Sequence, residues 1–153
     1  MVRPATAEDA NLLVAWHGDP EIARYWDHKT FTREEILARL ARPHVAAFIV
    51  EAEERPVGYL QAWFDSESEG AGLDMFLIPS MRGRGLGPDA ARTLARSLCS
   101  AGQMLLSVDP YLWNEAAIRA WGKAGFRPVE EREPDKEHTG RWLLMTFDAA
   151  SAM

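Results

Sequence analysis

The chain has 153 residues, of which 47% are hydrophobic, so its length and composition suit one folded domain spanning residues 1–153. It carries 17 Lys and Arg against 23 Asp and Glu, a net charge of −6, which argues against nucleic acid as a partner and favours a cationic ligand. A single cysteine fits a cytoplasmic location, and neither a membrane-spanning run nor a secretory leader is expected.

The first half of the chain predicts helices followed by an antiparallel meander. Residues 1–3 form at most a stub of strand, and Thr6 caps a helix with apolar positions from 10 to 17. A short helical turn follows at 22–26. A second helix opens at Thr32, where Glu35 has capping-box spacing, and ends at Pro43. Strands are expected over 45–51, 57–64 and 72–78, with turns at 53–56 and 65–70.

The second half alternates helix and strand. We expect helices over 88–101 and 114–124, the first with Pro88 in its first turn and the second ended by Gly125. Strands are expected over 104–109, 126–132 and 142–147. The predicted fold class is α+β, with a mixed central sheet, an N-terminal antiparallel meander and flanking helices.

A glycine-rich segment lies between the strand at 72–78 and the helix that follows it. It reads Arg82-Gly83-Arg84-Gly85-Leu86-Gly87-Pro88. Loop amides and the helix dipole converge on an anion at such a point, and glycines let the backbone approach a pyrophosphate. The segment lacks the Gly-Lys-Ser/Thr ending of a nucleoside triphosphate loop. It therefore predicts a phosphate cradle, with a purely structural turn as the alternative.

Two aspartates are candidates for acid–base chemistry. Alternation along the strand at 72–78 puts Asp74 on the face of Phe76 and Ile78, where a carboxylate needs a partner. Asp109 ends the next strand, and ligands gather at the carboxyl ends of strands. Carboxylates both anchor an ammonium group and accept its proton. The alternative is that Asp74 faces solvent and Asp109 begins a turn before Pro110.

Two motifs carry a family resemblance. The run R-x-x-G-x-G at residues 82–87 resembles the acetyl-CoA pyrophosphate loop of the GNAT N-acetyltransferases, and the run N-x-x-A-I-x-x-W-x-K-x-G-F at 114–126 resembles the helix of that family. A narrower resemblance is to the aminoglycoside 6'-N-acetyltransferases. It depends on Gly58-Tyr59-Leu60-Gln61, Gly72-Leu73-Asp74, Asp109-Pro110 and Pro134-Asp135.

The resemblance implies a set of site residues. Acetyl-CoA would be the cofactor, with the thioester carbonyl polarised by backbone amides near Leu77 and Ile78. The remaining cofactor contacts fall on Arg82, Gly83, Arg84, Gly85, Leu86, Gly87, Pro88, Asn114, Trp121 and Lys123. Aminoglycoside contacts fall on Gln61, Asp74, Asp109 and Asp135. We add Asp65, in an acidic turn with Glu67 and Glu69, and Trp26, which either stacks on a sugar ring or packs in the core.

One departure from the family pattern concerns the leaving group. The family commonly has Tyr, a proton donor to the CoA thiolate, where this chain has Trp121, whose indole only donates a hydrogen bond and cannot act as that acid. Water, the ammonium formed on attack, or Tyr111 are the alternative proton sources. No role is assigned to His17, His28, His44 or His138, and no metal is expected because no Cys and His cluster has zinc spacing.

The sequence thus predicts direct acetyl transfer to a primary amine of a cationic small molecule, with Asp74 and Asp109 as candidate catalytic residues. The expected acceptor is the 6'-amino group of an aminoglycoside. A protein N-terminus, a lysine or a polyamine is the alternative acceptor, and a non-catalytic acetyl-CoA sensor is the alternative class. The oligomeric state is left open.

Overall fold

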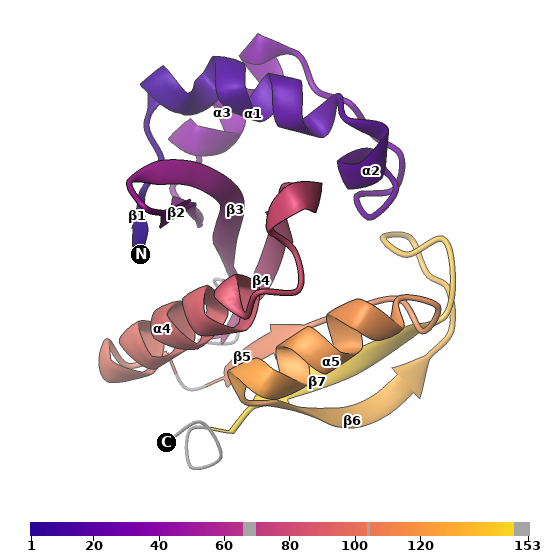
Figure 1. Cartoon of the computed structure of the whole chain (residues 1–153). Helices are drawn as coiled ribbons and strands as arrows, with labels where there is room; N and C mark the ends of the chain where they lie inside the picture. The colour runs from indigo at the N-terminus through magenta and orange to yellow at the C-terminus, as the bar shows by residue number, and fades with distance from the viewer. Residues whose placement is uncertain (66–69, 104, 149–153) are drawn as a thin grey trace. The chain divides into compact units, whose positions relative to one another are not determined.

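The computed structural model describes residues 1–65, 70–103 and 105–148 and divides into two compact units (Figure 1). Unit 1 comprises Met1–Trp63 and Asp74–Gly87, and unit 2 comprises Phe64–Leu73 and Pro88–Met153. In the described ranges no helix is both long enough and apolar enough to cross a bilayer.

Unit 1 places its helices against one face of its strands (Figure 1). The helices are α1 (Ala10–His17), α2 (Pro20–Ala23) and α3 (Arg33–Ala41), after a short 3-10 turn at Ala7–Asp9. The strands are β1 (Val2–Pro4), β2 (Val45–Ala52), β3 (Arg55–Phe64) and the second half of β4 (Gly70–Leu77). Buried side chains from both layers form one core: Ala10, Leu13, Ile22, Ile36, Ile49, Tyr59 and Phe76.

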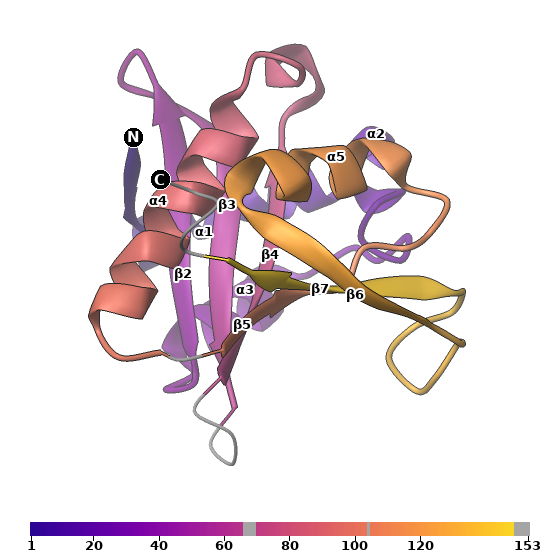
Figure 2. The same ribbon diagram turned by 90° about the horizontal axis from the view of Figure 1, so that it is seen from below.

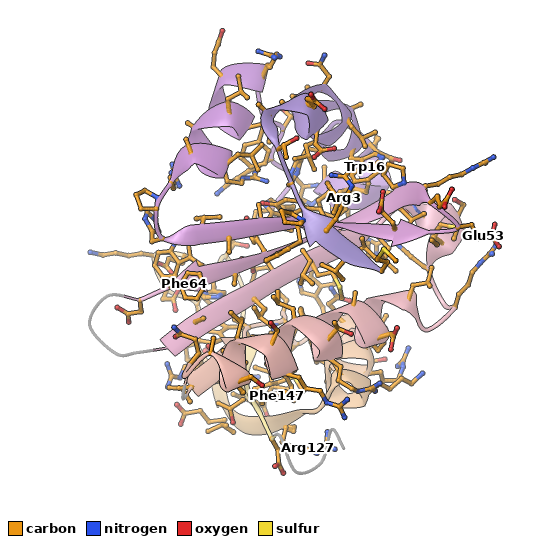
Figure 3. The ribbon with its side chains drawn as sticks, turned by 90° about the vertical axis from the view of Figure 1, so that its left-hand side faces the viewer. Arg3, Trp16, Glu53, Phe64, Arg127 and Phe147 are labelled. Carbon is orange, nitrogen blue, oxygen red and sulfur yellow. The ribbon has the colours of Figure 1, made fainter. Side chains whose placement is uncertain are left out.

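Local sequence explains the element ends in unit 1. The Thr32 hydroxyl accepts from the Glu35 amide while the Glu35 carboxylate accepts from the Thr32 amide, so the predicted capping box starts α3. The β2–β3 hairpin turns at Glu53 and Glu54, both with positive φ, and Glu53 lies at its tip (Figure 3). Gly58 is required by packing, because a Cβ there would lie 2.6 Å from the Phe76 carbonyl oxygen.

Unit 2 pairs a helix with three closing strands. Helix α5 (Glu115–Ala124) lies along β5 (Leu105–Val108), β7 (Trp142–Phe147) and β6 (Phe126–Arg132), and Trp121 of α5 packs edge-on against Phe126 of β6 (Figure 2). Gly125 ends α5 in the left-handed region, with φ 113°. The long connection between β6 and β7 extends beyond the strand ends (Figure 2).

The strands are hydrogen-bonded in the order β1-β2-β3-β4-β5-β7-β6, and the sheet is mixed because β4 pairs in parallel with β5 whereas β5 and β7 are antiparallel. The predicted fold class is confirmed. The strands at 126–132 and 142–147 have the predicted ends. Helix α4 (Leu86–Ser100) starts two residues before the predicted Pro88. The proline is tolerated because the first amides of a helix have no partner within it.

Candidate active site

The glycine-rich loop of unit 1 leads from β4 into the first turn of α4. Gly83 and Gly85 have φ values of 78° and 79°, a region that L-amino acids with side chains rarely adopt. No atom lies within 4 Å of a Cβ built on either residue, so the backbone is open to a ligand there. The loop has the exposed glycines, the cationic Arg84 and the helix start that a diphosphate group needs.

Arg82 is held on the protein side of this loop. Its Nη2 donates to the Glu21 carbonyl oxygen at 2.9 Å and its Nε to the Leu77 carbonyl oxygen at 3.3 Å. The guanidinium also lies 5.2 Å from the centre of the Tyr25 ring. Arg82 therefore fastens the loop to α2 and the end of β4, whereas Arg84 is exposed.

Asp74 has the partner that its position on β4 demanded. The Gln61 Nε2 on β3 donates to Asp74 Oδ2 at 2.9 Å, and the Tyr59 hydroxyl donates to Gln61 Oε1 at 2.7 Å. Because the hydroxyl donates and the carboxylate accepts, the two bonds define which way the Gln61 amide faces. The buried Tyr59 thus positions Gln61, and Gln61 positions the half-buried Asp74.

Of the two backbone amides predicted to face the thioester, one is already used. The Ile78 amide donates to the Val57 carbonyl oxygen at 2.9 Å. An amide has a single proton to donate, so the Ile78 amide is committed to Val57.

The guanidinium of Arg39 is a buried cation that packs against the Tyr59 ring in unit 1. The Arg39 guanidinium packs 4.6 Å from the Phe31 ring centre and 5.5 Å from that of Tyr59, and its Nη1 donates to His17 Nε2 at 3.1 Å. His17 has no exposed surface, and burial followed by the Arg39 charge lowers its pKa to about 4. This pair could not be predicted from the sequence, because nothing in the spacing of His17 and Arg39 marks them as neighbours.

Unit 2 joins two of the predicted aspartates through a histidine. His138 Nε2 lies 2.7 Å from Asp109 Oδ2, and its Nδ1 lies 2.8 Å from Asp135 Oδ1. Burial by itself would lower the pKa of His138, but the hydrogen bonds and charges of Asp135 and Asp109 outweigh it and raise that pKa. The hydrogen bond from His138 in turn lowers the pKa of Asp135. His138 was assigned no role from sequence. Its spacing of three residues from Asp135 was the available signal.

The other predicted residues have varied surroundings. Trp26 is half-buried, with its ring edge-on to His17 and Phe76, and Asp65 is exposed where its amide donates to the Gly70 carbonyl oxygen. Glu67 and Glu69 lie outside the described residues. The Tyr111 hydroxyl accepts from the Thr139 amide at 3.2 Å.

The cofactor residues predicted on α5 each have a structural position. Asn114 caps the helix, with its side-chain oxygen accepting from the Ala117 amide at 3.2 Å. Trp121 is 7% exposed and packs in the core of unit 2, and Lys123 is exposed. Gln61 and Asp74 are brought together in unit 1, and Asp109 and Asp135 in unit 2.

Comparison with known proteins defines the class. Residues 5–133 match the family described as the acetyltransferase (GNAT) domain. Because this match covers most of the chain, the chain belongs to that family, and it is an acetyl-CoA-dependent N-acetyltransferase. The resemblance predicted from the loop and helix motifs is confirmed.

Solved structures share the fold. The chain is 24% identical to the aminoglycoside acetyltransferase AAC(6')-Ib in complex with paromomycin and acetyl-CoA, covering 99% of this chain and 94% of that chain at a TM-score of 0.84. It is 20% identical to a ribosomal-protein-alanine N-acetyltransferase from Brucella melitensis, covering 95% and 98% at 0.79. A spermidine N-acetyltransferase mutant from Vibrio cholerae is 13% identical, covering 100% and 97% at 0.78. These proteins are named for different acceptors, so the shared fold does not choose among acceptors.

Proposed function

We propose that this enzyme acetylates a primary amine of a cationic small molecule, with the 6'-amino group of an aminoglycoside as the specific acceptor. The observation that carries the proposal is Asp74 held by Gln61, in the strand that leads to the glycine-rich loop. One unit thereby contains a carboxylate for the amine and a backbone cradle for the diphosphate of CoA. The proposal includes a cytoplasmic location and neither nucleic acid nor membrane as a partner.

The loop residues fit acetyl-CoA. Gly83 and Gly85 leave space around their backbone, and Arg84 adds positive charge where a diphosphate would lie. Gly87 is buried against Met75, since a Cβ on it would lie 3.1 Å from Met75 Cε, and the loop is thereby held close to β4. Acetyl-CoA, when bound, supplies the acetyl group and departs as CoA.

Asp74 performs the first proton transfer in this proposal. An amine with a pKa near 10 is protonated at neutral pH and must lose a proton before its nitrogen attacks an acyl carbon. Asp74 binds the ammonium group and takes that proton, directly or through one water molecule. The new bond joins the amine nitrogen to the acetyl carbon, the carbon–sulfur bond breaks, and the sulfur takes up a proton released from the nitrogen or from water.

The choice of an aminoglycoside is supported by residues rather than by the fold. Gln61, Asp74, Asp109 and Asp135 all match the short motifs of the 6'-N-acetyltransferases. The net charge of −6 favours an acceptor with several ammonium groups. A peptide acceptor has no comparable demand for this many carboxylates.

A thiol-release assay tests the proposal. The enzyme with acetyl-CoA would be offered kanamycin, spermidine and a lysine-containing peptide at equal concentrations, and mass spectrometry would locate the acetyl group. We expect kcat/KM at least tenfold higher with kanamycin than with the other two, with the label on the 6' nitrogen. Equal or higher turnover of spermidine or peptide would overturn the aminoglycoside assignment. If none of the three amines led to release of thiol, all three acceptors would be ruled out.

A further inference from the structure

The His138 imidazole lies between two carboxylates, one on each ring nitrogen. The distances are 2.7 Å to Asp109 Oδ2 and 2.8 Å to Asp135 Oδ1. An ionised carboxylate only accepts hydrogen bonds, so both ring nitrogens must donate, and only the imidazolium cation has two N–H groups. The geometry therefore requires a positive charge on His138 that is shared by both aspartates.

The two aspartates differ in how many donors they already have. Asp135 Oδ1 accepts from the Glu137 and His138 amides at 2.9 Å as well as from the His138 ring, and its Oδ2 accepts from Trp142 Nε1 at 3.2 Å. In the part of the chain that the structure describes, the Asp109 carboxylate has His138 as its single partner. Asp135 thus accepts four hydrogen bonds from the protein, whereas Asp109 accepts one and keeps more acceptor capacity for a ligand.

Exposure does not separate the two aspartates, because the Asp109 side chain is 47% exposed and the Asp135 side chain 46% exposed. The His138 side chain between them is 9% exposed, and its ring stacks on Trp142 with centres 4.1 Å apart. Two residues after Asp109, the Tyr111 ring stacks on Trp113, which is 52% exposed. A half-exposed carboxylate next to accessible aromatic faces is the chemistry that binds an ammonium group.

We propose that His138 is a specificity-determining residue, a built-in cation that replaces one ammonium group of the acceptor, so that the Asp109–Asp135 pair binds a single ammonium group, at Asp109. This inference depends on the proposed function, because it concerns the charge of the acceptor. It also revises the role expected for Asp135, which becomes a positioning residue for His138.

The charge arithmetic defines the expected preference. Two carboxylates and one imidazolium sum to −1, and without the imidazolium the sum is −2. Among the described residues, the other titratable or charged groups packed against this cluster are Tyr111 and Arg132. The Tyr111 ring centre lies 6.0 Å from that of His138, and the Arg132 guanidinium lies 5.4 Å from the Trp142 ring centre. The hydrogen bonds and charges of Asp135 and Asp109 raise the pKa of His138 and so favour the −1 state. Acceptors with many ammonium groups are therefore bound less tightly than the two aspartates alone would allow.

The test replaces His138 with a neutral side chain. His138→Gln would be compared with Lys136→Gln, an exposed residue of the same loop whose replacement makes the same change in net charge. We expect His138→Gln to lower KM about tenfold for an acceptor with four ammonium groups and less than twofold for one with a single amine. Lys136→Gln should change both less than twofold. Equal effects of the two variants would overturn the inference.

The pH dependence of KM gives a second measurement that a merely structural role would not change. In the wild type, KM for the four-charge acceptor should fall as the pH rises through the pKa of His138, while the amines remain protonated, and the His138→Gln profile should be flat. Nitrogen NMR of the wild type should find both His138 ring nitrogens protonated at pH 7. A neutral His138 at pH 7 would overturn the inference even where the variant does not fold.

The two proposals fail in distinguishable ways. If the wild type acetylates amines and the effect of His138→Gln on KM is the same for acceptors of every charge, only the role of His138 is overturned. Absence of acetylation in the wild type would overturn the proposed function, and calorimetric binding of the same amines would then decide the inference. No difference in binding between wild type and His138→Gln would overturn it.

Discussion

Two buried histidines, one in each unit, have pKa values that are shifted in opposite directions. His17 of unit 1 is 0% exposed and His138 of unit 2 is 8% exposed, so burial alone would make both neutral. His17 accepts a hydrogen bond from the Arg39 cation and has its pKa lowered to about 4, whereas His138 donates to two carboxylates and has its pKa raised. Burial followed by the Arg39 charge lowers the pKa of His17, whereas the two carboxylates beside His138 reverse the effect that burial has on its pKa.

The same contrast separates the aspartates. Asp74 of unit 1 is held by the neutral amide of Gln61, which leaves its negative charge uncompensated by that contact. Asp109 and Asp135 of unit 2 share the charge of His138. A carboxylate held by a neutral donor suits proton acceptance, and one held by a cation suits anchoring. The contrast in donors supports the proposed role of Asp74 as proton acceptor and that of Asp109 as an anchor for an ammonium group.

The largest effect is expected from Asp74→Asn. The asparagine can still accept from Gln61 but cannot take a proton, so kcat should fall 100- to 1,000-fold, in line with loss of a general base. Acetyl-CoA affinity should stay within twofold, as measured by calorimetry. Glu53→Gln, at the tip of the β2–β3 hairpin, is the matched control and should retain full turnover. Activity of Asp74→Asn within threefold of wild type would remove Asp74 from the mechanism.

The free energy of unfolding at acid pH should depend on the protonation of His17. Its folded pKa of about 4 lies below the unfolded value near 6.5, so the folded state resists protonation and stability falls as the pH drops from 6.5 towards 4. The loss is up to about 3 kcal/mol. Urea denaturation across this range would measure it. The His17→Gln side chain can accept from Arg39 but does not titrate, so the free energy of unfolding of this variant should depend less on pH below 6.5. The same pH dependence in variant and wild type would contradict the lowered pKa of His17.

A smaller effect is expected from Tyr59→Phe. Removing the hydroxyl frees the Gln61 amide to rotate, so Asp74 loses its oriented partner and kcat should fall about tenfold, equal to about 1.4 kcal/mol. KM for acetyl-CoA should be unchanged in the same steady-state experiment. If the variant lost stability but kept its kcat, Tyr59 would contribute to packing of the core and not to the positioning of Gln61.

The smallest effect is on the alkaline side. The raised pKa of His138 contributes stability below about pH 6.5 that is lost as the pH rises through the folded pKa. Because its partner carboxylates are about half exposed, the loss should be under about 1 kcal/mol. Denaturation of wild type and His138→Gln between pH 6 and 9 would measure it. If the free energy of unfolding of the wild type and that of the variant had the same pH dependence, the ion pairs of His138 with Asp109 and Asp135 would be contradicted.

Much of the fold was predictable, and the reasons are local. The capping box at Thr32 and the left-handed Gly125 each act within a few residues. The candidate site was predictable only where it, too, depends on the spacing of residues close together in the sequence. Asp74 on the face of Phe76 needed a partner by alternation alone, and the partner, Gln61, came from a motif on the preceding strand. His138 lies 29 positions from Asp109, and no local pattern brings these two residues together.

The sequence alone determined the strands and helices, the glycine-rich loop that leads into α4 and the family to which the chain belongs, because these depend on residue type and short spacing. Only the tertiary structure showed the charged partners of the two buried histidines and the donors that each of the three aspartates has. Those properties depend on which charges lie within about 3 Å of a side chain, and long-range packing sets such distances.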